Sequence, residues 1–457
     1  MTAGKGLSRP RVVRGGQRTV VTPIRSRHAA VAGAVASTLV ALALWAWPSP
    51  AAAATCGGSR PCKCGDTVTA SYDLTENLGP CPGHGLLLKS NVRLDCRGFG
   101  IVGRGNGSEQ FGIFLSGKSG AEIMGAAVKG CRVSGFLRGI RLRSASNNLI
   151  VGNTASGNGD ENAHVGYGID VSGASHDNVF EGNQVRGNAD EGVHVGRGSH
   201  KNRLVGNVIA DNYRENLYVL DADRGVFLRN TLGGGGVNSL YLKDSSFNHF
   251  EGNTFLGRTA RIIGDAHDNV FVGNTFSGAG LHFLPYKGLA RHPSNNRVTG
   301  GTITEAEDCL RFTSSSGNLV VDTTLGQCGT AVRGESRTGP SENTLVGIDP
   351  ASVALEETSS LKVGARVGVH VQDAAGAPVA GAQVQAKDAV GSPGFTAVTD
   401  ESGNIPGQIV IMSIQVGGRT TSRTPLEVTV TKSGYAAEVR TVPVTAPLRL
   451  TVSLKPR

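Results

Sequence analysis

A short phrase ending in Gly-Asn returns at a nearly constant interval and constrains the fold more than any other feature of the sequence. It occurs as NNLIVGN, DNVFEGN, KNRLVGN, FNHFEGN and DNVFVGN, with GVFLRN in the one gap, and the copies end at Asn153, Asn183, Asn207, Asn230, Asn253 and Asn274. The successive spacings are 30, 24, 23, 23 and 21 residues. A unit this short cannot bury an apolar face alone, so the copies must stack on one another.

Each repeat also carries a brief alternation of apolar and polar residues, seen in GIRLRS, GIDVSG, GVHVGR, NLYVLD and SLYLKD. A period of two over four or five residues indicates a β-strand, and the 3.6-residue period of a helix is missing. The 66 glycines supply tight turns. We therefore predict two or three short strands per repeat, stacked so that their apolar side chains form one column.

The asparagine at constant phase predicts a corner of each coil. Asparagine tolerates left-handed backbone geometry, and stacked amide side chains can bond along the stacking axis. With this N-x-[VLF]-x-G-N spacing, the chain resembles the right-handed parallel β-helix, pectin-lyase-like family over roughly residues 86 to 350. The resemblance implies an all-β, single-stranded, right-handed parallel β-helix, and it says almost nothing about substrate.

The two ends of the repeat region differ from it in composition. Residues 55–110 resemble the opening of exported bacterial members, in which a cysteine-rich segment caps the first coil of a β-helix assigned to 111–353. Residues 354–457 alternate strictly, which predicts a small antiparallel β-sandwich. This last segment resembles the carboxypeptidase regulatory-like, transthyretin-type domain through Asp373, Gly376, Pro378, Val379, Gly381, Ala382, Thr399, Asp400 and Gly403.

Residues 1–54 have the pattern of a secretory signal peptide. Seven basic residues and no acidic residue occur in them, and an apolar stretch at 29–47 is followed by small residues up to Ala54. We therefore expect a secreted, periplasmic or cell-surface protein. An uncleaved membrane anchor is the alternative, because 19 apolar residues can just span a bilayer.

The charge balance argues against a nucleic-acid partner. The formal net charge is +9, but without residues 1–54 the chain has 38 basic and 36 acidic residues. A surplus of two is no electrostatic footprint for nucleic acid. We expect a monomer whose partner is a polysaccharide.

Eight cysteines follow the leader, and an even number in an exported chain favours disulfides. Cys309 and Cys328 stand apart from the rest, and we predict that they pair. The pairing of the six earlier cysteines stays open. Cys62 and Cys64 form a C-x-C, which is a weak zinc signal. We expect no cofactor; calcium is conceivable near the acidic residues, although no loop has the spacing of a calcium site.

Stacked coils place residues of equal phase in columns spaced about 4.8 Å apart. In the short alternations the aliphatic residues point inward, so the residue between them points outward. This outer column comprises Phe114, Arg141, Asp170, His194, Tyr218, Tyr241, Ile262, His282, Arg311 and Arg333. A second column, three residues earlier, comprises Arg138, Tyr167, Glu191, Glu215 and Asn238.

This face is rich in titratable and aromatic residues, which indicates a ligand groove rather than plain solvated surface. Asp170 beneath His194 is the arrangement that orients an imidazole as a general base. Tyr218 or Tyr167 can give or take a proton, and Arg141 can neutralise a carboxylate. The remaining candidates for substrate binding are Glu191, Glu215 and Tyr241.

This combination suits a uronic acid, because abstracting its carbon-5 proton requires a neutralised carboxylate, a base and then an acid. The outcome would be a lyase or a carbon-5 epimerase. The sequence also resembles alginate epimerases, which bear a Tyr-Gly-Phe-Asp-Pro-His motif: Tyr167, Gly168 and Asp170 match, and Ile169 is conservative. Val171 and Ser172 stand where proline and histidine would be, so that chemistry requires His194 to replace the missing histidine.

Other hypotheses remain open at this stage. The protein could be a non-catalytic surface or matrix protein that binds glycan, or a glycoside hydrolase that uses Asp170 with Glu191 or Glu215. The face could also be ordinary solvated surface. Three further histidines, His176, His200 and His267, recur two residues before the corner asparagine, which favours turn constituents over metal ligands.

Overall fold

The computed structural model describes residues 54–105, 110–286 and 291–457. The predicted signal peptide, residues 1–54, lies outside the described residues except for Ala54. Every regular element of the described part is a β-strand, as predicted. This part contains no helix that is long and apolar enough to cross a membrane.

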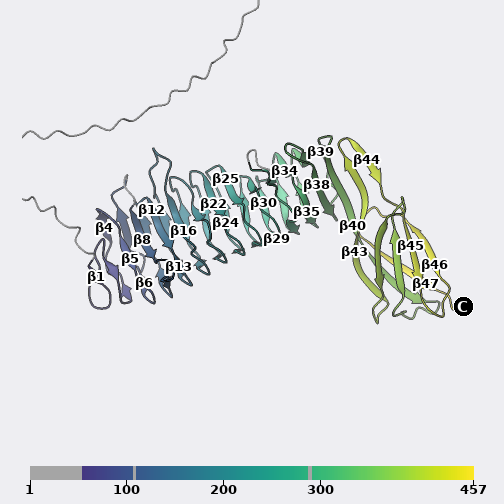
Figure 1. The fold of residues 1–457 in the computed structure, drawn as a ribbon, viewed down its shortest axis with the longest axis horizontal. Coiled ribbons are helices and arrows are strands. Elements are labelled where there is room, and N and C mark those ends of the chain that lie inside the picture. Colours follow the sequence, from purple (N-terminus) through teal and green to yellow (C-terminus); the bar gives the residue numbers. More distant parts are fainter. Residues whose placement is uncertain (1–53, 106–109, 287–290) are drawn as a thin grey trace, which may run out of the picture. The chain divides into compact units, whose positions relative to one another are not determined.

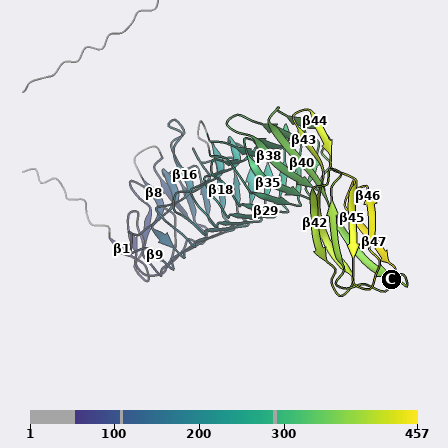
Figure 2. The same cartoon turned by 45° about the vertical axis from the view of Figure 1, so that its right-hand side comes forward.

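The repeats form a parallel β-solenoid, in which each coil contributes one strand to each of three sheets (Figures 1 and 2). One coil consists of β16 (Tyr167–Ser172), β17 (Val179–Glu181) and β18 (Gln184–Arg186), and β19 (Val193–Val195) then starts the next coil on top of β16. The solenoid followed by a small antiparallel β-sandwich confirms the predicted fold class.

Sheet 1 carries the predicted outer columns. In its parallel register each outer residue pairs with the next one of the predicted column, from Asp170 through His194 and Tyr218 to Tyr241. Its strands are β1 (Thr55–Cys56), β2 (Thr67–Val68), β5 (Leu86–Leu88), β8 (Phe111–Ser116), β12 (Arg138–Arg143), β16, β19, β22 (Glu215–Leu220), β25 (Asn238–Lys243), β28 (Ala260–Ile263), β31 (Leu281–Leu284), β34 (Asp308–Thr313), β37 (Thr330–Glu335) and β39 (Val353–Leu355).

One position of the predicted outer column is wrong. Tyr241 pairs with Arg261, and Arg261 pairs with His282, whereas Ile262 is fully buried. The reason is that Ala260 takes the inward position before the outer residue, a place that a larger aliphatic residue fills in the other coils. Arg261 therefore belongs to the outer face.

Sheet 2 contributes a stack of buried aromatic rings, in which the ring centroids of Phe227, Phe250 and Phe271 lie 4.4 and 4.7 Å apart. Its solenoid strands are β3 (Tyr72–Asp73), β6 (Arg93–Asp95), β10 (Ala127–Lys129), β14 (Leu149–Val151), β17, β20 (Arg203–Val205), β23 (Val226–Leu228), β26 (His249–Glu251), β29 (Val270–Val272), β32 (Arg297–Thr299), β35 (Ser316–Val321), β38 (Ser341–Val346) and the start of β40 (Ser359–Asp373).

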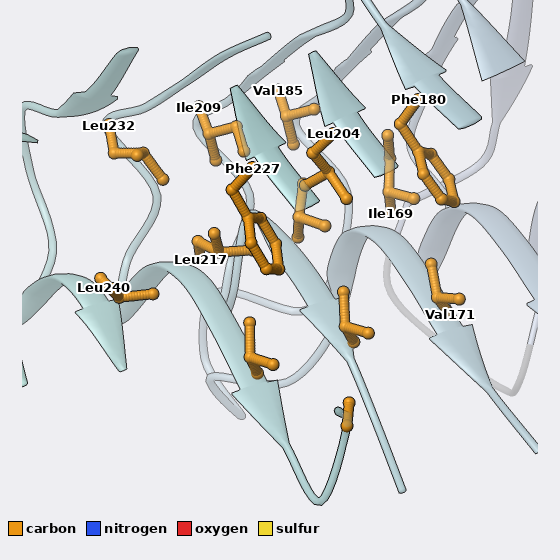
Figure 3. Packing of buried hydrophobic residues seen from close by; sticks show 14 of the residues in the cluster. Ile169, Val171, Phe180, Val185, Leu204, Ile209, Leu217, Phe227, Leu232 and Leu240 are labelled. Atoms are coloured by element: carbon orange, nitrogen blue, oxygen red, sulfur yellow. The ribbon is translucent and has the colours of Figure 1, made fainter. Parts of the chain in front are cut away.

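Sheet 3 closes each coil, and buried aliphatic residues such as Val185, Ile209 and Leu232 face the core from it (Figure 3). Its strands are β4 (Leu78–Cys81), β7 (Gly100–Gly103), β11 (Arg132–Ser134), β15 (Thr154–Ser156), β18, β21 (Val208–Ala210), β24 (Thr231–Gly233), β27 (Thr254–Leu256), β30 (Thr275–Ser277), β33 (Thr302–Thr304) and β36 (Thr324–Gly326). A short pair, β9 (Ile123–Met124) with β13 (Ala145–Ser146), lies outside the three sheets.

Buried asparagines form a ladder at the corner between sheets 2 and 3. The side-chain amide of Asn183 donates to Oδ1 of Asn207 at 2.9 Å, and so does the backbone N–H of Asn183. Asn207 repeats both bonds with Asn230 and also donates to the carbonyl of Phe180. The ladder therefore satisfies corner groups that the sheets cannot pair.

The same ladder corrects one expectation about the corners. The left-handed residue is the one before the asparagine, for example Gly182 or Arg229, with φ of 61° and 50°. The asparagine itself is not left-handed at this corner. Its side chain points inward to the ladder while its predecessor makes the turn. Further ladders run along the other two corners, through residues that include Asn178 and Asn188.

Four disulfides are present in the described residues. Two of them lie within residues 55–110, between Cys56 and Cys62 and between Cys64 and Cys81, and a third joins Cys96 of that segment to Cys131 of the β-helix. The fourth joins Cys309 to Cys328 near the other end of the solenoid. Cys62 and Cys64 are thus both occupied, which leaves the C-x-C without free thiolates for zinc.

The C-terminal sandwich grows out of sheet 2. The first residues of β40 pair with β38, through Gly364, and β40 then continues into a sheet with β43 (Asn404–Val416), β44 (Arg419–Ser422) and β47 (Leu448–Leu454). The facing sheet contains β42 (Pro393–Val398), β41 (Gln383–Lys387), β45 (Leu426–Thr431) and β46 (Glu438–Val442). Both sheets contribute valines to a separate hydrophobic core. The carboxypeptidase regulatory-like identity of this part stays a prediction.

Replacing Asn207 by alanine should lower the free energy of unfolding by about 3 kcal/mol, because it leaves both Asn183 donors buried without an acceptor. Chemical denaturation followed by circular dichroism measures the change. Gln184→Ala is the matched control, since Gln184 is exposed one residue after the ladder. Equal stability of the two variants would contradict the ladder's role.

Candidate functional site

Asp170 and His194 meet on the outer face of sheet 1. Nδ1 of His194 lies 3.2 Å from Oδ1 of Asp170, whose side chain is only 3% exposed. Since a carboxylate accepts hydrogen bonds, this contact assigns the ring hydrogen to Nδ1. Nε2 of His194 is then the nitrogen that can accept a proton from a ligand.

Two tyrosines flank this imidazole. The ring centroid of Tyr167 lies 4.9 Å from that of His194, with the rings stacked, and the centroid of Tyr218 lies 5.4 Å away. Tyr241 then meets Tyr218 edge-on at 5.2 Å. The imidazole extends over Gly196, where a Cβ would come within 2.9 Å of Cε1 of His194. Glycine at 196 thus leaves space for the ring.

Asp170 is also the counter-ion of two arginines. Oδ2 of Asp170 lies 3.0 Å from Nε of Arg138 and 3.2 Å from Nε of Arg141. The guanidinium groups lie over aromatic rings, that of Arg138 over Tyr167 and that of Arg141 over Phe111. The two guanidinium groups thus share one carboxylate beside the imidazole. Arg141 was predicted from the sequence, whereas Arg138 had been placed in a column without a role.

Replacing Asp170 by asparagine should lower the free energy of unfolding by about 3 kcal/mol, because Arg138 and Arg141 lose their shared counter-ion in a half-buried position. Denaturant unfolding measures it. The control is Asp177→Asn at an exposed left-handed corner position, which asparagine tolerates. If both variants unfold at the same denaturant concentration as the wild type, the ion pairs of Asp170 with Arg138 and Arg141 do not stabilise the fold.

An acidic cluster lies beside the same face, at the corner where sheet 3 leads into sheet 1. It consists of Asp190, Glu191 and Glu215, which are all buried. Arg214 faces all three, at 3.4 Å from Asp190, 3.9 Å from Glu191 and 3.6 Å from Glu215. Asn238 donates to Oε1 of Glu215 at 3.0 Å. One cation thus serves three carboxyl groups.

The cluster holds protons more tightly than ordinary carboxyl groups do. Burial raises the pKa of Glu191 to about 9, and the neighbouring charges of Asp190 and Glu215 add to the effect. Burial also raises the pKa of Asp190 and that of Glu215. At neutral pH Glu191 therefore carries a proton, which relieves the repulsion expected for stacked acidic residues.

Both flanking phenols are proton donors at neutral pH. Burial raises the pKa of Tyr167 to about 12, with Glu191, Asp190 and Asp170 contributing. Burial, together with Tyr241 and Glu191, likewise raises the pKa of Tyr218. Tyr241 shows the same direction, again chiefly because of burial. These tyrosines suit the role of acid in a proton transfer better than that of base.

The coil with the 30-residue spacing carries an inserted loop, residues 159–166, next to the cluster. Asp160 and Val165 bridge the loop, and His164 stacks on Tyr213 at 4.0 Å, with the hydroxyl of Tyr213 3.2 Å from Nε2 of His164. A cavity of about 370 Å³ lies there, lined by Glu161, His164, Gly187, Asn188, Ala189, Asp211 and Tyr213. The long spacing signals this loop in the sequence, but its partner Tyr213 has no such signal.

The structure separates the remaining candidates from this site. The corner histidines bond locally, His176 to Asp177 and His267 to Asp268 through Nδ1 at 2.7 and 2.8 Å. Among residues 54–105, 110–286 and 291–457, no group of three or more His, Cys, Asp or Glu side chains is arranged to hold a metal ion. Asp190 and Arg214 were missed from the sequence because they lie in the turns between the aligned phrases.

Replacing Glu191 by glutamine should change how stability depends on pH. The raised pKa means that the wild type loses stability as pH rises from the ordinary glutamate value towards about 9, because ionisation is disfavoured in the folded state. The variant lacks this loss, so its melting temperature relative to wild type should increase with pH over that window. Melting curves from pH 5 to 9 test this. A difference that stays constant with pH would contradict a protonated Glu191.

One family model matches this chain. A family model described as "Right handed beta helix region" matches residues 90–231 and, in a second overlapping match, 163–284. No curated protein matches the sequence.

Solved structures similar to this chain include two epimerases. A single-site mutant of the periplasmic alginate epimerase AlgG is 12% identical, with 55% of this chain covered and a TM-score of 0.36; the match spans 62% of that epimerase, less than two thirds of it. The A-module of the Azotobacter vinelandii mannuronan C-5 epimerase AlgE4 is 14% identical, with 66% and 88% of the two chains covered and a TM-score of 0.33.

A third similar structure is a mutant of DFA-IIIase from Arthrobacter chlorophenolicus A6 in complex with DFA-III, 12% identical, with 66% and 88% of the two chains covered and a TM-score of 0.36. Identities and TM-scores this low carry no conclusion about the activity of this chain. The coils stack as a parallel β-solenoid, and the family model for a right-handed β-helix region matches residues 90–284 of it.

Proposed function

We propose that this protein acts on an acidic polysaccharide by abstracting the carbon-5 proton of a uronic acid unit, with His194 as the base. The supporting observation is the contact between Asp170 and His194 on a half-exposed face, flanked by Tyr167 and Tyr218. A carboxylate-oriented imidazole between two protonated phenols provides both the base and the acid that this chemistry needs.

The proposed step starts when Nε2 of His194 accepts the carbon-5 proton. The electron pair of the broken C–H bond then moves into the substrate carboxylate, and the guanidinium groups of Arg138 and Arg141 stabilise the resulting anion. Tyr218 or Tyr167 donates its phenolic proton. In a lyase the electron pair then returns to form the carbon 4–carbon 5 double bond, the glycosidic bond from carbon 4 to oxygen breaks, and the phenol protonates the leaving oxygen. In an epimerase the pair returns to carbon 5, which the phenol protonates from the opposite side.

The setting of the reaction is also proposed. Four disulfides suit an oxidising compartment, so we assign the protein to the cell exterior, the periplasm or the cell surface. It would work as a monomer on a polysaccharide and without a cofactor. The hydrolase alternative has less support, because Asp170 contacts two arginines and a histidine and is shielded from solvent. A non-catalytic glycan-binding role is the second candidate.

Replacing His194 by alanine should abolish turnover, with at least a hundredfold loss of rate, because the base is removed. Wild type and variant would be incubated with a panel of polyuronates. Ultraviolet absorbance detects an unsaturated product, and incorporation of solvent deuterium at carbon 5 detects epimerisation.

The control is His176→Ala, because His176 is a corner histidine on another part of the coil. It should retain wild-type turnover. Full activity of His194→Ala would refute the assignment of the base, and a wild type that binds a polyuronate without altering it would favour the glycan-binding role.

A further inference from the structure

Arg261 is a cation of the outer column that has no counter-ion. Within the residues that the structure describes, no carboxylate lies within ion-pair distance of its guanidinium group, and its Nε is buried without a hydrogen-bond partner. The Nε of Arg311 is in the same state although Arg311 pairs with Glu335, so the feature that sets Arg261 apart is that no described carboxylate lies near it. Every other arginine of this column, Arg141, Arg311 and Arg333, has a carboxylate partner.

A cavity of about 310 Å³ lies beside Arg261 at the corner between sheets 3 and 1. Gly257, Gly278 and Gly280 line part of it, and their missing side chains leave the space open. Arg258 and His282 contribute polar walls. Burial lowers the pKa of His282 to about 4, so this ring is neutral at physiological pH and adds no positive charge.

The charge of the cavity favours an anion. Its acidic lining residues are Glu307 and Asp308. Both oxygens of Asp308 lie 2.9 Å from Nε of Arg333, so this carboxylate is already neutralised. Glu307 is exposed to solvent, which leaves it as the single acidic group against Arg258 and Arg261. An incoming carboxylate therefore meets a net positive wall with a free guanidinium group.

The position of Arg261 relates the cavity to the site already described. Arg261 is three coils above His194, through Tyr218 and Tyr241, which corresponds to about 14 Å at the usual strand spacing. The intervening tyrosine rings are half-buried on the same face, and such rings suit stacking with sugars. A chain of sugar units that reaches His194 can therefore extend along the tyrosines to the cavity.

We propose that Arg261 and its cavity form a distal subsite that binds the carboxylate of a second uronic acid unit on the same polysaccharide chain. This inference rests on the proposed function and adds that tight binding requires an oligosaccharide long enough to reach Arg261. Short oligomers bind at His194 alone, whereas longer ones also pair with Arg261. The subsite selects for polymers that carry a carboxylate at the distant unit, and it takes no part in the proton transfer.

The experiment measures the affinity of a series of oligouronides, from disaccharide to octasaccharide, for the wild type, Arg261→Met and Arg261→Lys by isothermal titration calorimetry. Methionine keeps much of the stem but removes the charge. We expect the longer oligomers to bind the methionine variant at least tenfold more weakly, while the shortest binds all three proteins equally. Lysine should restore part of the affinity, and turnover of the shortest substrate should be unchanged.

Two controls separate charge recognition from a change in structure. Arg224→Met removes an exposed arginine at the opposite corner of sheet 1 and should leave affinity unchanged at every length. Carboxyl-reduced oligomers should bind the wild type and Arg261→Met alike. Wild-type affinity of Arg261→Met at all lengths, or an equal loss at all lengths, would overturn the subsite.

The two proposals fail in different ways. If His194→Ala abolishes turnover while Arg261→Met binds long oligouronides like the wild type, only the subsite is wrong. If the wild type neither binds nor alters any oligouronide, the proposed function fails and the subsite fails with it.

Discussion

The hydrogen-bonded asparagine ladders are the interaction on which the rest of this structure depends. A coil that turns three times exposes backbone groups at every corner, and these groups are buried once the coils stack. Each buried asparagine satisfies them in two coils at once, because its oxygen accepts from the coil below and its nitrogen donates along the axis. The ladder therefore fixes the position of one coil on the next, and this register then sets every column on the outer face.

The outer face shows what such a register makes possible. Asp170, His194 and Tyr218 are each separated by 24 residues in sequence, yet the parallel pairing of β16, β19 and β22 places them in successive coils. The stacked coils hold the imidazole over Gly196 and between two tyrosine rings. The same stacking confines three carboxyl groups to one corner, so that burial keeps a proton on Glu191. The stacking of the coils thus fixes the position of the His194 ring and also raises the pKa of Glu191.

Sequence reasoning succeeded wherever a residue belonged to a repeated phrase. The column from Arg141 to Tyr241 could be aligned, because aliphatic neighbours mark which residue points outward. It failed at Arg261, where Ala260 is too small to mark the inward position by its hydrophobicity. It also missed Asp190, Arg214 and Tyr213, which lie in turns whose length varies from coil to coil. A periodic pattern carries no information about residues outside the period.

By itself, the sequence determined the all-β class, the stacking of coils and the membership of the outer columns, because a period of about 23 residues with alternating apolar positions allows only one way to bury the apolar side chains. Only the tertiary structure decided which charges meet. Two arginines converge on Asp170, one arginine serves three carboxyl groups, and no carboxylate of the described residues pairs with Arg261. These pairings depend on side-chain direction and burial within a few ångströms, and a repeat pattern specifies neither.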